Sequence, residues 1–544
     1  MSQAGLEEAR ARIFRAQRFV TLEGPDVEAL VVAGADGGRL LARGSWDGAR
    51  RRFPEAEVVE LEGTVVPGFN DAHQHLAIAS EDLLHLDLSS DAVASHRELL
   101  TTLGQEAART QPGGWVRGSR YDDAKTSGTE RLTRAQLDEA TGEVPTLVVH
   151  VACHWGVANS AALARAGIDD ATPPPPGGDF GHDAAGRLNG VLLEQALFDF
   201  GMPAMSRSGT SVAPASSLTD RLDGLRRATE RWHAAGLTSI CDAMVGPDDV
   251  ALFSEAEARG LLTLRTGMLV AAPHYDLVHD LRLRSGLGDE RLKFVGVKAF
   301  LAGAVGGRTC LVEEPHADGG HGIQTTSTED LREIVRTVHG DGNRIGVHAN
   351  GDRAIAILLD VLEEASAADP RPGLRHRIEH CSMVDERLVR RIADLHAIAV
   401  PFGSYPWYHG GALLDWYGEE RVARMFAHRD LLDAGVTVAG SSDYPCGPVE
   451  PLLGLQSCVT RTGYDGRPVG ERQRISVEEA LRVYTVGSAV ATGEEHLKGT
   501  LSPGRLADFV ELSADPRAVG PATLGRIRVR STWVGGGQVW PPTG

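Results

Sequence analysis

Several apolar runs of this chain end in a side chain that can bind a metal ion, and this recurrence restricts the choice of fold more than any other feature. The first run, residues 66–75, ends in His73 and His75. Side chains two positions apart on a strand point to the same side, so this pair offers two nitrogens to one ion. One such pair is a weak signal, because two surface histidines beside a turn give the same pattern. Later runs end in the same kind of residue: Lys298, His348, His380 and Asp443.

From residue 236 onward, β-like runs alternate with helical patterns. The runs are residues 237–242, 262–270, 294–298, 344–348, 376–380, 397–400 and 436–443. With the strand that ends in His75 they make eight β/α units, the number that closes a (β/α)8 barrel. Reactive groups of such barrels lie at the C-terminal ends of the strands, where every candidate ligand lies here. The sequence therefore predicts an α/β protein with a TIM-type barrel.

Short β-like runs separated by glycine and aspartate stand at both ends of the chain. The N-terminal runs, residues 18–23, 29–33, 39–43 and 57–61, have the pattern of a small antiparallel sheet, and the C-terminal runs are residues 507–512, 527–534 and 538–540. We predict one composite β-sandwich domain built from residues 1–66 and 499–544. The metal-dependent barrel would then span residues 67–498.

The interval from about residue 77 to 228 is much longer than one β–α connection needs. It contains a β-like run at 145–151 and a proline-rich segment at 173–178. We interpret it as a large insertion after the first barrel strand. Such an insertion would cover the barrel mouth and shape the substrate pocket.

The charge balance bears on the partners of the protein. A net charge of −19 argues against nucleic acid or an anionic membrane as the main partner. No apolar segment is long enough for a membrane span, and residues 1–10 lack a basic-then-apolar leader. We therefore expect a cytoplasmic protein that acts on a small molecule, with a homodimer left open.

Four histidines and an aspartate at one barrel mouth suit a borderline divalent metal, most often zinc. One or two ions, and other divalent metals, stay open. Lys298 is the exception, because an ammonium beside a dication would be repelled. Carbamylation by CO2 would turn it into a carboxylate able to bridge two ions, whereas an ordinary lysine would extend to the rim.

The chain resembles the amidohydrolase superfamily, and within it the YtcJ-like branch that includes N-substituted formamide deformylases. The matching segments are residues 67–75 (PGFNDAHQH), 153–163 (CHWGVANSAAL), 190–194 (GVLLE), 297–300 (VKAF), 347–354 (VHANGDRA), 378–380 (IEH), 440–445 (GSSDYP) and 499–508 (GTLSPGRLAD). Members of the branch usually read Lys-x-Phe-x-Asp-Gly-Ser after the lysine, and residues 298–304 (KAFLAGA) lack both the acid and the hydroxyl. The resemblance therefore does not carry a substrate with it.

The resemblance implies a role for each ligand. It places one metal on His73 and His75, a carbamylated bridge at Lys298, and the second metal on His348 and His380. It implies that Asp443 binds the first metal and handles protons. The metal would lower the pKa of its water towards about 7, and the hydroxide would attack a carbonyl while Asp443 passes the proton to the leaving nitrogen.

Two residues of the predicted insertion are further candidates for the catalytic site. His154 could donate to the substrate carbonyl, and a core histidine bonded to backbone fits the sequence as well. Glu194 lies in an apolar run, where a carboxylate is costly without a partner, and this favours a role in the pocket.

These observations predict a metal-dependent hydrolase of a carbon–nitrogen bond. We expect a linear amide, or an N-acyl or N-formyl amine, with an apolar substituent as substrate. The alternatives are a metal-dependent lyase or isomerase, or a cyclic-amide hydrolase, on the same scaffold. A catalytically silent scaffold is a further alternative, against which the full set of ligands argues.

Overall fold

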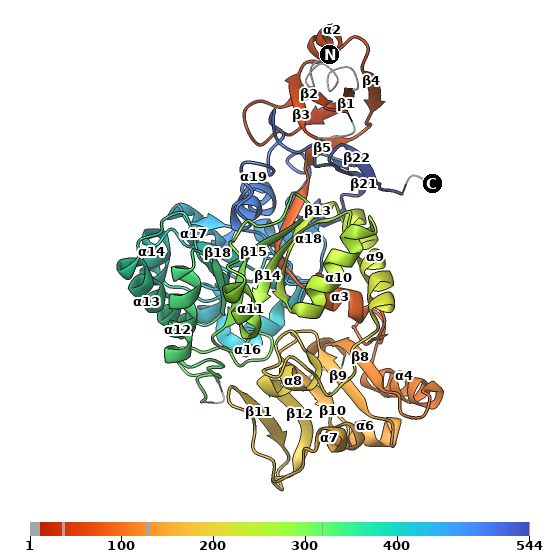
Figure 1. The fold of residues 1–544 in the computed structure, drawn as a ribbon, viewed down its shortest axis with the longest axis vertical. Helices are drawn as coiled ribbons and strands as arrows, with labels where there is room; N and C mark the ends of the chain where they lie inside the picture. Colours follow the sequence, from red (N-terminus) through yellow and green to blue (C-terminus); the bar gives the residue numbers. More distant parts are fainter. Residues whose placement is uncertain (1–10, 35–37, 127–130, 318, 543–544) are drawn as a thin grey trace.

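A curled parallel sheet lies at the centre of the computed structural model, which describes residues 11–34, 38–126, 131–317 and 319–542 (Figure 1). Its eight strands, in order, are β6 (Phe69–Gln74), β13 (Leu237–Val245), β14 (Arg265–Ala271), β15 (Leu292–Phe300), β16 (Ile345–Ala349), β17 (Arg377–His380), β18 (Ile398–Pro401) and β19 (Thr437–Val438). Each coincides with one of the predicted β-like runs. The prediction of an α/β fold with parallel strands in this order is confirmed.

The strands of this sheet are buried on both faces. Every residue of β13 and β14 is buried, as expected for parallel strands covered by helices. The chain that follows β19 also meets β6, because Ala72 N–H donates to the Gly440 carbonyl and Asp443 N–H donates to the His73 carbonyl, both at 2.9 Å. The two edges of the sheet thus approach each other. The C-terminal ends of its strands consequently face a common mouth.

Helices follow the strands and pack outside them. They are α9 (Leu218–Ala234), α10 (Pro247–Ala258), α11 (Tyr275–Asp280), α12 (Thr328–Gly340), α13 (Asp352–Ala368), α14 (Glu386–Asp394), α15 (Tyr405–His409), α16 (Gly411–Val422), α17 (His428–Asp433) and α18 (Pro451–Thr460). In α12, Leu331, Val335 and Val338 recur at helical spacing and are buried, whereas the opposite face is charged. Ser327 caps this helix by accepting from the backbone N–H of Asp330.

Strands from both ends of the chain form a second sheet at one end of the long axis of the molecule (Figure 1). Its order is β22 (Gly537–Trp540), β21 (Val529–Val534), β20 (Phe509–Leu512), β5 (Thr64–Pro67), β1 (Arg12–Phe19), β2 (Val27–Val32) and β3 (Leu40–Gly44), with β4 (Glu57–Glu60) also on β1. The expectation of purely antiparallel N-terminal strands is wrong, because β4 and β5 run parallel to β1. Helix α2 (Trp46–Arg52), which the sequence analysis did not predict, connects β3 to β4. This connection lets β4 pair with β1 in the parallel direction.

A third sheet, from the chain between β6 and β13, lies at the opposite end (Figure 1). Its order is β11 (Gly178–His182), β12 (Leu188–Glu194), β10 (Trp155–Ala158), β9 (Thr146–His150), β8 (Val116–Tyr121) and β7 (Leu86–Asp87). The helices of the same interval are α4 (His96–Arg109), α5 (Asp123–Thr126), α6 (Arg134–Thr141), α7 (Ser160–Ala166) and α8 (Gln195–Gly201), together with α3 (Leu76–Asp82), which packs against α9 outside the central sheet. Of these strands the sequence predicted only β9.

Among the residues that the structure describes, no helix combines the length and the apolar character that crossing a membrane requires. Residues 1–10, on which the expectation of no leader rests, lie outside the described part of the chain. The cytoplasmic location stays a prediction.

Candidate metal centre

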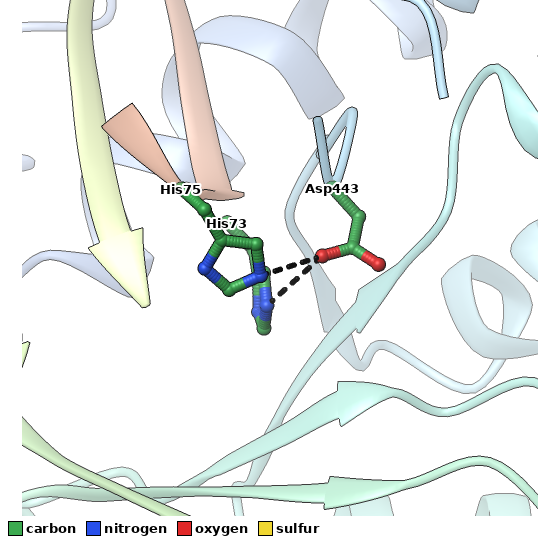
Figure 2. Close-up of side chains that lie close together, drawn as sticks. All are labelled: His73, His75 and Asp443. Atoms are coloured by element: carbon green, nitrogen blue, oxygen red, sulfur yellow. Dashed lines mark hydrogen bonds and ion pairs between the residues drawn. The ribbon is translucent and has the colours of Figure 1, made fainter. Parts of the chain in front are cut away.

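His73, His75 and Asp443 converge at the mouth of the parallel sheet. Figure 2 shows both imidazoles directed at the same carboxylate oxygen. The Nε2 atoms of His73 and His75 lie 3.4 Å and 3.1 Å from Asp443 Oδ1. One donor atom from each residue lies within 4.8 Å of the others, and all three side chains are buried. This spacing allows the three atoms to bind one ion.

A buried ion pair fixes the ring of His73. Its Nδ1–H donates to Glu379 Oε2 at 2.5 Å, which leaves Nε2 without a proton, facing Asp443 Oδ1 and Lys298 Nζ. Glu379 is held in turn by Arg377, whose Nε and Nη2 donate to the two carboxylate oxygens at 2.6 Å and 2.9 Å. Histidine ligands of metals commonly donate their second N–H to a carboxylate in this way. Neither Glu379 nor Arg377 was assigned a role from the sequence.

The histidines of the later strands reach the same place. The ring centroid of His380 lies 4.6 Å from that of His73 and 4.4 Å from that of His348. His380 Nδ1 lies 3.9 Å from Asp443 Oδ2 and, like His75 Nδ1, has no hydrogen-bond partner among the described residues. His348 Nε2 lies 2.8 Å from Asn350 Nδ2 and 3.3 Å from the Gly303 carbonyl oxygen. All the predicted histidine ligands therefore meet at one mouth.

Lys298 lies inside this group rather than at the rim. Its side chain is fully buried, with Nζ 3.5 Å from His73 Nε2 and 4.6 Å from the centre of the Phe300 ring. Burial lowers the pKa of Lys298 to about 8. The alternative of an ordinary lysine extending into solvent is wrong.

The protonation states suit metal binding. Burial lowers the pKa of His73 to about 4, and burial together with neighbouring imidazoles lowers the pKa of His348 and His380 well below the ordinary value. Burial raises the pKa of Asp443, but the hydrogen bond from His75 and nearby positive charge outweigh this and hold the pKa below its ordinary value. At neutral pH His73, His348 and His380 are thus neutral imidazoles and Asp443 is an ionised carboxylate.

The backbone is strained where these side chains converge. His380 has φ 71°, Asp443 has φ 51° and Glu194 has φ 51°, all in the left-handed region. For residues other than glycine this conformation costs about 1–3 kcal/mol each, and it concentrates at functional sites. No sequence pattern signals this strain.

His154 and Glu194 approach the centre from the third sheet. The ring centroid of His154 lies 4.8 Å from that of His348. Its Nδ1 hydrogen-bonds to Glu194 Oε2 at 2.6 Å, and Thr309 Oγ1 donates to Glu194 Oε1 at 2.7 Å. The buried carboxylate therefore has partners, as the sequence required, and His154 is tied to a carboxylate rather than to backbone. Thr309 could not be recognised from the sequence.

A second group of potential ligands, Asp122, Asp123 and His150, lies in the third sheet and its loops. His150 Nδ1 accepts from the backbone N–H of Ala152 at 3.1 Å, so its proton is on Nε2. That nitrogen lies 3.3 Å from Asp123 Oδ1, and the interaction with His150 lowers the pKa of Asp123. In this group the imidazole faces a carboxylate, as His73 faces Glu379.

Comparisons with known proteins agree with this geometry. A profile described as "Amidohydrolase family" matches residues 57–540. The chain is 31% identical to the putative amidohydrolase YtcJ of Bacillus subtilis (strain 168), over 95% of this chain and 97% of that protein. It is 30% identical to the N-substituted formamide deformylase of Arthrobacter pascens, over 93% of this chain and 94% of that protein.

The fold is similar to that of a metal-dependent hydrolase from Pyrococcus horikoshii OT3, with a TM-score of 0.74 and 24% identity over 94% of this chain and 99% of that one. The profile match and the identity to curated relatives extend over nearly the whole chain. The chain therefore belongs to the amidohydrolase family, whose hydrolases act on carbon–nitrogen bonds.

Proposed function

We propose that this protein hydrolyses a linear amide, an N-acyl or N-formyl amine, at a divalent metal centre, with Asp443 as the group that moves the proton. The observation that carries the proposal is the arrangement around His73. Glu379 fixes the tautomer of His73 by accepting its Nδ1–H. The Nε2 atoms of His73 and His75 then lie 3.4 Å and 3.1 Å from the same oxygen of Asp443. The substrate class follows the relative named as an N-substituted formamide deformylase.

The residues fit a divalent metal, for which zinc is the proposed identity. His75 Nδ1 and His380 Nδ1 are buried without partners in the described chain, which is costly unless a ligand engages these rings. His73, His75 and Asp443 would hold one ion, and His348 and His380 a second. A metal bound there supplies a Lewis acid that lowers the pKa of water and polarises a carbonyl.

Asp443 is placed for both proton transfers of amide hydrolysis. Its carboxylate is ionised and faces the space between the imidazoles. It accepts a proton from the attacking water and then donates that proton to the departing nitrogen, so that an amine leaves and an acid remains. The same carboxylate therefore serves first as base and then as acid.

Lys298 and His154 complete the proposed site. The buried amine of Lys298, with its lowered pKa, would add CO2 with loss of one proton, and the resulting carbamate would offer carboxylate oxygens to the metal. His154 donates Nδ1–H to Glu194 and, when its ring carries both protons, would stabilise the substrate carbonyl oxygen by donating a hydrogen bond from Nε2. NMR after labelling with isotopic bicarbonate detects the carbamate.

We also propose the finer architecture that this function requires. In this proposal the parallel sheet closes into a (β/α)8 barrel that spans residues 67–498. The segment from about residue 77 to 228 is an insertion that covers the mouth of this barrel. Residues 1–66 and 499–544 form the composite β-sandwich domain. The backbone hydrogen bonds between β6 and the chain after β19 support closure of the barrel.

Removing the metal is the direct test of the proposed function. We expect the purified protein to contain a transition metal, to lose hydrolysis of N-formyl and N-acyl amines on chelation, and to regain it when Zn²⁺ is added. In water enriched in heavy oxygen the acid product should carry the solvent oxygen, which a lyase or isomerase would not produce. Metal analysis, a substrate screen and mass spectrometry give these readouts. Protein that holds no metal, or that forms no labelled acid from any amide, would contradict the proposal.

Replacing His154 by phenylalanine tests its proposed role. Because one donor to a developing oxyanion contributes about 10²–10³ in kcat, we expect a loss of that size with unchanged metal content. Phe198 and Phe300 already flank the ring, so an aromatic replacement keeps the packing. His182→Phe, at an exposed position, is the matched control. If His154→Phe keeps the wild-type kcat, His154 only packs in the site and does not stabilise the substrate carbonyl oxygen.

A further inference from the structure

Two cavities adjoin at the candidate centre. The pocket that contains the proposed metal ligands has a volume of about 20 Å³, and a neighbouring cavity has a volume of about 140 Å³. Both are lined by Ile78, Cys153, Met202 and Met244. The centre thus has little free space, and a substituent of the substrate must extend past these four side chains.

The larger cavity lies between helix α3, strand β8 and the start of α10, and it contains both signs of charge. Its arginines are already paired. Arg117 lies 3.4 Å and Arg221 3.2 Å from oxygens of Glu81, and Arg120 pairs with Asp87. No arginine is therefore left to bind an anionic substrate.

Asp82 and Ser119 are the exceptions in this lining. Asp82 Oδ2 and Ser119 Oγ are buried and form no hydrogen bond with any other residue in the part of the chain that the structure describes. The Ser119 hydroxyl lies close enough to Asp82 to lower the pKa of that carboxyl by hydrogen bonding, whereas burial raises it to about 7. A buried carboxyl with a single hydroxyl beside it lacks hydrogen bonds, and a donor from a ligand supplies one.

We propose that the larger cavity binds the nitrogen substituent of the amide and that Asp82 and Ser119 recognise a hydrogen-bond donor, a hydroxyl or an ammonium, at the far end of that substituent. Ile78, Met202 and Met244 flank the passage between the cavities, so the intervening part of the substituent is aliphatic. This inference rests on the proposed function. It changes the expected substrate from one with a purely apolar substituent to one with a polar end.

A matched set of formamides tests the inference on the metal-loaded enzyme. The set compares N-alkyl, N-(hydroxyalkyl) and N-(aminoalkyl) formamides in series of increasing chain length. We expect kcat/KM of the best donor-ended compound to exceed that of its alkyl counterpart by about 10–100-fold, the value of a hydrogen bond to a charged group. A preference for the hydroxyl compound would show that the site recognises a neutral donor, and a preference for the amino compound would show that it recognises an ammonium. Either preference over the alkyl compound supports the proposal.

Variants of the two residues identify the contact. Asp82→Asn should remove most of the preference, through KM rather than kcat, while leaving hydrolysis of the alkyl compound unchanged. Ser119→Ala should lower the kcat/KM preference for the donor-ended compound by about 2–10-fold. Asp223→Asn, an exposed carboxylate on α9, is the matched control. A purely structural role of Asp82 would instead affect all three substrates equally.

Two results overturn different statements. If the wild-type enzyme hydrolyses alkyl and donor-ended formamides equally, or if Asp82→Asn and Ser119→Ala keep the preference, the inference is wrong and the proposed function stands. If none of the compounds, nor any other amide, is hydrolysed by metal-loaded enzyme, the proposed function itself is wrong.

Discussion

Replacing Asp443 by asparagine is expected to lower kcat by about 10²–10⁴-fold without unfolding the protein. General acid–base catalysis contributes a factor of this size, and asparagine keeps the shape of aspartate while it cannot take up the proton. His73, His75, His348 and His380 remain to hold metal. Steady-state kinetics, circular dichroism and metal analysis of the same preparation check the three parts of this prediction.

The matched control is Asp433→Asn, which removes an exposed carboxylate from helix α17 and should leave kcat unchanged. A second outcome separates catalysis from binding. If Asp443→Asn loses its metal together with its activity, Asp443 acts mainly as a ligand. If the variant retains both metal and near wild-type kcat, the proton must move through another group.

The central sheet could be predicted because its strands carry their own signal. Apart from β17, which reads RIEH, the strands from β13 to β18 are short and largely apolar runs between helical patterns, and such runs are typical of fully buried parallel strands. The third sheet carried no comparable signal. β8 and β11 contain arginine, aspartate and glycine, and they pair through contacts that only the tertiary structure creates.

The site shows the same division. His73, His75, His348, His380 and Asp443 were predictable because each stands at the end of an apolar run, a position that a barrel brings to one mouth. Glu379 gave a weaker signal, as a charged residue two positions after Arg377 within a buried strand. Thr309 gave none, because its contact with Glu194 depends on how a loop after β15 folds onto the third sheet.

The third sheet contributes to both halves of the proposed activity. It places His154 beside the metal ligands through the bond to Glu194, and its strand β8 supplies Ser119 to the larger cavity. Because binding residues of barrel enzymes lie on the loops over the barrel mouth, we expect a change in this segment to alter specificity without moving the ligands.

Replacing Glu379 by glutamine should weaken the protein in two measurable ways. The guanidinium of Arg377 is fully buried, and without a carboxylate it becomes an uncompensated buried charge, so the free energy of unfolding should fall by about 3–5 kcal/mol. His73 also loses the carboxylate that accepts its Nδ1–H, and metal affinity should fall by about 10–100-fold. Denaturant unfolding of the metal-free protein measures the first effect, and titration against a competing chelator measures the second.

A double variant separates these two effects. Arg377→Met combined with Glu379→Gln removes the unpaired charge, so stability should recover while metal affinity stays low, because the partner of His73 is still an amide. Glu363→Gln breaks an exposed pair with Arg391 and should cost less than about 1 kcal/mol with no change in metal binding. Wild-type metal affinity in Glu379→Gln would show that the carboxylate stabilises the barrel only. Recovery of affinity in the double variant would show that the metal responds to the packing of β17 rather than to the charge on the residue that orients His73.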